Sequence, residues 1–113
     1  MKTIYTDLYK LNPKITLSML RKNGFTTENI YRKSVYKDMI QFELEVDLEE
    51  KKFSYSVNDL CNGQLYIPFY NSYYGGVNKV LNHVEKSVKD AFRGLEKKNI
   101  LVRIENENSR KVS

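Results

Sequence analysis

The alternation of apolar and polar residues over positions 39–57 predicts an amphipathic β-hairpin. Between positions 40 and 48 apolar residues alternate strictly with Gln, Glu and Asp, the period-2 pattern of a strand with one buried face. Phe53, Tyr55 and Val57 alternate with Lys and Ser in the same way. We therefore expect strands over 39–48 and 52–57 that pair antiparallel across a turn at Glu50-Lys51.

Two further segments have the pattern of strands. Asn62-Gly63 is a strong turn signal, and we expect a strand near 64–68 that ends at Pro68. Alternating apolar residues predict a last strand over 100–105, before a polar stretch over 106–113 that we expect to be a frayed tail. The prediction is one antiparallel sheet of three to five strands.

The longest periodic segment predicts a helix over 76–98. Its apolar residues recur at intervals of three and four, which places them on one stripe about 120° wide. These residues are Val77, Val80, Leu81, Val84, Val88, Ala91, Phe92 and Leu95. We expect this stripe to cover the apolar face of the sheet.

The N-terminal third predicts two short helices. Asn12 and Pro13 suit the N-cap and first turn of a helix over 13–23, and Gly24 suits its end. Thr26 suits the N-cap of a second helix that would continue through position 31. The elements together indicate a single α+β domain spanning 1–113, with the first helix at an edge or end of the sheet.

Composition excludes several classes of protein. A single cysteine, Cys61, excludes an internal disulfide framework and a cysteine-cluster zinc site. No apolar run approaches the ~20 residues of a membrane span, and Tyr5, Asp7 and Lys10 stand where a signal peptide would be apolar. We therefore expect a cytoplasmic protein with no membrane association, no bound metal and no cofactor.

The net charge of +5 conceals an uneven distribution of charged residues. Residues 1–36 contain seven basic and two acidic groups, residues 37–60 three and seven, and residues 61–113 nine and five. The five cations opposite the apolar stripe of the long predicted helix define a basic ridge: Lys79, Lys86, Lys89, Arg93 and Lys97. We interpret this ridge as a surface for phosphates or for an acidic protein, the alternative being an ordinary solvated face.

Tyrosines form a second candidate contact surface. Tyr70, Tyr73 and Tyr74 lie in an aromatic segment that ends on two glycines, and tyrosine is enriched at binding surfaces. The alternative is that this segment covers one end of a small core.

An acidic strand is the third candidate. Glu43, Glu45 and Asp47 share one face of the first predicted strand at intervals of about 6.7 Å, which resembles a row of phosphates. Phosphate mimicry or an Mg²⁺-binding carboxylate pair would use these side chains. The alternative is the polar face of an amphipathic strand.

Catalytic residues are not indicated by the sequence. His83 falls on the polar side of the long helix and Cys61 lies beside the Asn-Gly turn, so no nucleophile and base are brought together. Glu49-Glu50-Lys51 matches the E-x-K fragment of some nucleases, but it falls in the predicted turn.

The segment from Ser87 to Arg103, with the polar and basic residues after it, resembles the recognition helix and wing of winged-helix DNA-binding proteins. The resemblance implies DNA binding through that helix. In that family a separate helix and a turn precede the recognition helix, whereas here the apolar stripe runs in phase from Val77 to Leu95 and indicates one unbroken helix.

Three hypotheses for function follow. The first is a small non-catalytic binding protein with a nucleic-acid-related role, typical of a phage or plasmid accessory gene, whose basic ridge contacts phosphates. The second is a protein-binding inhibitor of a nucleic-acid-handling host enzyme, of the anti-defence or anti-CRISPR kind, which uses the acidic strand or the tyrosines. The third is a small Mg²⁺-dependent nuclease. The expected partner is thus nucleic acid or a nucleic-acid-handling protein, and a homodimer is compatible with the sequence.

Overall fold

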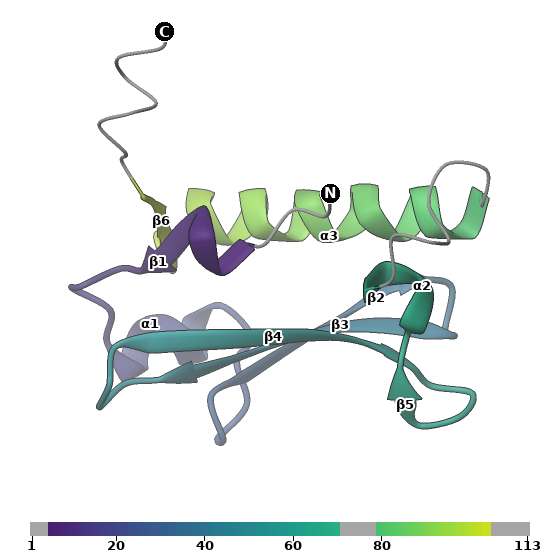
Figure 1. The fold of residues 1–113 in the computed structure, drawn as a ribbon. Coiled ribbons are helices and arrows are strands. Elements are labelled where there is room, and N and C mark those ends of the chain that lie inside the picture. The colour runs from purple at the N-terminus through teal and green to yellow at the C-terminus, as the bar shows by residue number, and fades with distance from the viewer. Residues whose placement is uncertain (1–4, 71–78, 105–113) are drawn as a thin grey trace, which may run out of the picture.

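The computed structural model describes residues 5–70 and 79–104, which form two layers (Figure 1). One layer is a four-stranded antiparallel sheet, and the other is the long helix α3 (Lys79–Lys97), which lies across it. This arrangement confirms the predicted α+β class. The predicted tail and the first residues of the predicted long helix lie outside the described residues.

The main sheet has the strand order β2-β3-β4-β5. β3 (Ile40–Asp47) and β4 (Lys52–Asp59) form the predicted hairpin, in which Phe42 lies opposite Val57. β5 consists only of Gln64–Leu65 and pairs with the end of β4. The strand predicted near 64–68 is therefore present in its first residues alone, because the short helix α2 (Ile67–Tyr70) begins directly after it.

The prediction of a second helix from Thr26 through position 31 is wrong. A turn leads instead into the strand β2 (Ile30–Tyr36). The Thr26 hydroxyl accepts hydrogen bonds from the backbone N–H groups of Glu28 and Ile30 (3.2 Å each), and Asn29 has a φ of 64°. These features close a turn instead of starting a helix. The aromatic and β-branched residues that follow then pair with β3, where their side chains fit a half-buried sheet.

α1 (Leu17–Lys22) is shorter than the helix predicted over 13–23. Its N-cap is Thr16, whose side chain accepts a hydrogen bond from a backbone N–H of the first turn (3.2 Å). Asn12 instead accepts from the backbone N–H two residues later (2.9 Å) and donates its amide to the Asn99 carbonyl (2.8 Å). The helix ends at Gly24 as predicted, since this residue takes the left-handed conformation (φ +88°).

The last strand, β6 (Leu101–Arg103), was predicted to join the main sheet, and this prediction is wrong. It pairs antiparallel with β1 (Tyr9–Leu11) in a separate two-stranded sheet. Asn99, with a φ of 63°, reverses the chain after α3, so that β6 returns beside the helix. β1 has only three residues, which is too short to produce a periodic pattern in the sequence.

The core lies between α3 and the inner face of the main sheet, and the Phe92 ring is at its centre. This ring stacks on Tyr5 (4.2 Å between centroids) and on Tyr9 (5.5 Å), and meets Phe42 and Tyr55 edge to face (5.3 and 5.2 Å). Tyr5 belongs to the short 3₁₀ turn η1 (Tyr5–Asp7). Phe92 therefore contacts α3's partners on both sides, the sheet and the η1–β1 segment.

None of the helices in the described part of the chain has both the length and the apolarity needed to cross a bilayer.

We expect Phe92→Ala to reduce the free energy of unfolding by about 3–5 kcal/mol, because it removes a fully buried ring and leaves a cavity. Urea denaturation followed by circular dichroism measures this change. Leu17→Ala, at a side chain that is 49% exposed, is the control and should change stability by less than about 0.5 kcal/mol. A loss at Phe92 no larger than that of the control would contradict its central place in the core.

Candidate functional site

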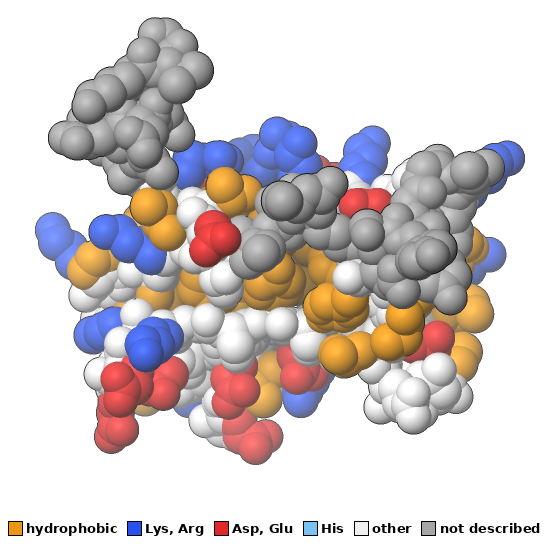
Figure 2. Space-filling view, viewed as in Figure 1, with side chains coloured by type: hydrophobic (Ala, Val, Ile, Leu, Met, Phe, Trp, Pro, Cys, Tyr) orange, Lys and Arg blue, Asp and Glu red, His pale blue; other side chains and the backbone are white. Residues whose placement is uncertain are grey.

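The basic ridge lies on the face of α3 that points away from the sheet. All five of its cations are exposed, because the opposite side of the helix is buried in the core. Figure 2 shows Lys and Arg side chains along this side of the molecule, while most of the acidic side chains in view gather on the opposite side. Positive charge is thus in excess on the α3 side of this view, and negative charge on the sheet side.

Asp90 lies among the ridge cations, about one helical turn from Lys86 and from Arg93. The ion pairs Arg32–Glu43 and Arg103–Glu96 of the described residues do not include a ridge residue. The ridge therefore carries an excess of exposed positive charge, which can attract an anion.

A hollow of about 300 Å³ opens beside the ridge, between α3, β6 and the η1–β1 segment. We call it the ridge pocket; it is lined by Tyr5, Leu8, Tyr9, Lys89, Arg93 and Arg103. Lys89 and Arg93 are ridge residues, and Arg103 comes from β6. Three cations from two elements therefore surround one concave site, an arrangement suited to a phosphate or another anion.

Arg103 is oriented by a small polar network. Its guanidinium lies over the Tyr9 ring (5.1 Å to the centroid), donates to the Tyr9 hydroxyl (3.0 Å) and approaches Glu96 Oε1 (3.4 Å). The Tyr9 hydroxyl in turn donates to the same Glu96 oxygen (3.2 Å). The Arg103 side chain nevertheless stays 55% exposed and accessible to a ligand. The sequence assigned Arg103 no role, because only the unpredicted pairing of β1 with β6 brings it to the ridge.

Tyr5 and Tyr9 contribute neutral hydroxyl groups to this region. Burial, with smaller contributions from Tyr55, Glu85 and Tyr9, raises the pKa of Tyr5 to about 12. Burial also raises the pKa of Tyr9, although the charges of Arg103 and Arg93 act on it in the opposite direction. Neither tyrosine is ionised near neutral pH, so neither offsets the positive charge of the ridge pocket.

The predicted tyrosine contacts are divided by the structure. Tyr70 is 41% exposed, and its hydroxyl accepts a hydrogen bond from the Val57 backbone N–H (2.7 Å). Tyr70 therefore anchors α2 to β4 while part of its ring remains in solvent. Tyr66 and Phe69 of the same segment are buried in the core. The predicted contacts Tyr73 and Tyr74 lie outside the described residues.

The acidic strand lies on the outer face of the main sheet, away from α3. Glu43 pairs with Arg32 of β2 (2.9 Å), and Asp47 accepts a hydrogen bond from the backbone N–H of Glu50 in the following turn (3.0 Å). Glu45 is exposed between them. Two of the three carboxylates that would mimic phosphates thus already have partners within the chain.

His83 and Cys61 have separate surroundings. The His83 ring meets Tyr36 of β2 edge to face (5.5 Å), and Cys61 is an exposed free thiol beside the turn before β5. Among the residues that the structure describes, no group of three or more His, Cys, Asp or Glu side chains is placed to hold a metal ion.

No protein-family model matches this chain, and no curated protein matches it. Among solved structures, its fold is similar to that of a DUF1831 family protein from Lactobacillus plantarum. The similarity has a TM-score of 0.60 and covers 85% of this chain and 86% of that one, at 16% sequence identity. At this identity the likeness supports the α+β fold alone, and it assigns no role to the ridge.

We expect stability to fall as the pH rises above about 10, the ordinary pKa of tyrosine in an unfolded chain. The folded state holds the Tyr5 proton up to a pKa of about 12, so the unfolded state loses its proton first and is favoured as the pH rises between the two values. Urea denaturation at increasing pH measures this slope. Tyr5→Phe should show a shallower decline than the wild type, and an unchanged slope would contradict the assignment.

Proposed function

We propose that the chain is a small non-catalytic binding protein of the cytoplasm whose basic ridge contacts the phosphates of a nucleic acid. The proposal is carried by one observation: five exposed cations, which outnumber the carboxylate Asp90 among them, share one face of α3. From Lys79 to Lys97 the ridge extends about 27 Å at 1.5 Å per residue. A linear array of this length matches a polyanion better than a small anion.

The make-up of the ridge favours nucleic acid over an acidic protein. Interfaces between proteins usually centre on apolar and aromatic residues, whereas interfaces with nucleic acid are mainly polar and cationic. None of the large hydrophobic residues exposed in the described part of the chain belongs to α3. The ridge pocket adds Arg103, whose planar guanidinium suits bidentate contact with a phosphate.

A second candidate function uses a different surface. Leu65, Ile67 and Tyr70 of β5 and α2 are exposed by 47%, 52% and 41%, and provide the apolar centre that a protein interface needs. This patch supports an inhibitor that binds a nucleic-acid-handling enzyme, as a phage or plasmid gene could encode.

Charge reversal tests the first candidate. Lys86→Glu with Arg93→Glu should weaken nucleic-acid binding by at least about tenfold and make its dependence on salt shallower, since each lost phosphate contact reduces the slope of log affinity against log salt by roughly 0.7–0.9. Fluorescence anisotropy with a labelled oligonucleotide at several salt concentrations measures both quantities.

Lys14→Glu with Lys22→Glu is the matched control for this test. It lowers the net charge by the same four units at exposed positions outside α3 and the ridge pocket, and should leave most of the affinity. Equal losses in the two double variants would indicate non-specific attraction by net charge and would reject the ridge as the binding surface.

Affinity purification from nuclease-treated host extract tests the second candidate. A partner protein that is retained after nuclease treatment, lost with Ile67→Glu and kept by the ridge double variant is the result expected of an inhibitor. Retention of that partner by Ile67→Glu would exclude the α2 surface as its binding site.

A further inference from the structure

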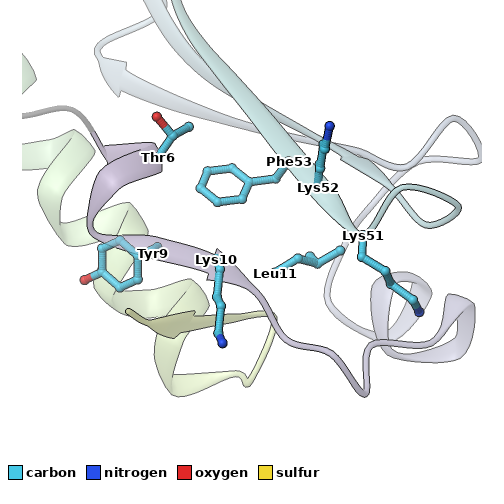
Figure 3. A pocket seen from close by; sticks show the side chains of 7 residues that line it. All are labelled: Thr6, Tyr9, Lys10, Leu11, Lys51, Lys52 and Phe53. Carbon is cyan, nitrogen blue, oxygen red and sulfur yellow. The ribbon is translucent and has the colours of Figure 1, made fainter. Parts of the chain in front are cut away.

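A second hollow, of about 260 Å³, lies between β1 and the start of β4 (Figure 3). We call it the β4 cleft; it is lined by Thr6, Tyr9, Lys10, Leu11, Lys51, Lys52 and Phe53. Tyr9 lines both this cleft and the ridge pocket, so the two hollows are neighbours across the η1–β1 segment. The sequence predicted no site here, because these residues come from two distant segments of the chain.

The floor of the β4 cleft is aromatic. The Phe53 ring projects from β4 toward η1 and β1, where Leu11 and the Tyr9 ring provide further apolar surface (Figure 3). Phe53 is only partly buried, and its contact with the core is a tilted approach to Phe92 (6.2 Å between centroids). Part of the ring therefore remains available to a planar ligand.

The rim of the cleft is cationic. Lys10, Lys51 and Lys52 are all exposed, and their ammonium groups point away from the Phe53 ring (Figure 3). An apolar floor with exposed lysines on both sides, one of them (Lys52) opposite Asp47 across the hairpin, suits a ligand with a planar centre and negative charges around it.

β4 also presents free backbone groups at this edge. The Val57 N–H donates to the Tyr70 hydroxyl, and the Val57 carbonyl accepts from the Tyr66 N–H, so both groups point away from β3. Because this direction repeats every second residue along a strand, the N–H and C=O of Phe53 also point away from β3. β5 pairs only with the last two residues of β4, and no backbone group within residues 5–70 and 79–104 pairs with Phe53 on this side.

We propose that the β4 cleft holds one unpaired nucleobase of a single-stranded nucleic acid whose phosphates lie on the rim lysines and on the ridge. The base stacks on Phe53, and its edge exchanges hydrogen bonds with the free N–H and C=O of that residue. This proposal rests on the proposed function and adds a preference for single strands. A duplex fills the cleft only after one of its bases has been unstacked and unpaired.

An added peptide strand fits this edge less well than a base does. Between the β3–β4 turn and the bonds already made by Val57, only the outward groups of Phe53 and Tyr55 are left for pairing. Pairing through a longer row of backbone groups is what gives an added strand its affinity. One planar group matches a cleft of about 260 Å³ with so short a free edge.

The test compares a single-stranded oligonucleotide with the duplex of the same length at one salt concentration. One base carries the fluorescent analogue 2-aminopurine, whose emission falls when it stacks, and the chain has no tryptophan to interfere. We expect the wild type to bind the single strand about tenfold more tightly than the duplex and to quench the analogue. Phe53→Leu should lose about tenfold in single-strand affinity, with unchanged duplex affinity and an unchanged salt slope.

Two further variants keep the test independent of folding. Phe53→Tyr retains a ring and should preserve both the preference and the quenching. Tyr31→Leu removes a partly buried ring that packs on the core from β2 without lining the cleft, and should leave both the preference and the quenching unchanged.

Equal affinities of the wild type for single strand and duplex, or an unchanged single-strand affinity in folded Phe53→Leu, would overturn the base site while leaving the ridge function intact. Absence of binding to either nucleic acid would overturn both proposals.

Discussion

The stacking of Tyr5 and Tyr9 on Phe92 is the contact on which the rest of the surface depends. Phe92 belongs to the buried stripe of α3, so these stacked rings hold the η1–β1 segment against the helix. β1 in turn pairs with β6 and lies beside β4. Both hollows border this segment, the ridge pocket toward α3 and the β4 cleft toward the sheet. A core interaction therefore shapes two surface sites.

Long amphipathic elements could be predicted from the sequence, and short ones could not. The β3–β4 hairpin and α3 bury one complete face each, and their periodicity of two or about 3.6 residues records that burial. β1 buries only Tyr9 and Leu11, which is too little for a pattern. The Thr26 turn has the same residue type as a helix N-cap, and only its hydrogen-bond partners distinguish the two structures.

Only the part of the candidate site that lies on one long helix could be predicted from the sequence. The five ridge cations could be assigned to one face because a single helix carries them all. Arg103 and the β4 cleft depend on segments that are far apart in sequence and meet through β1, and charge counts along the chain cannot reveal such a meeting. Lys51 and Lys52 even fall in the acidic third of the sequence, yet they lie on the rim of a cationic cleft.

The attachment of the described chain ends has a practical consequence for protein engineering. The Ile104 backbone N–H donates to the Leu8 carbonyl (2.9 Å), and Leu8 lines the ridge pocket together with Tyr5. The first and last described residues thus enter and leave the fold beside the same hollow. A bulky group introduced at Leu8 or Ile104 would crowd that hollow, whereas an insertion in the exposed β4–β5 turn at Asn62-Gly63 would leave it open.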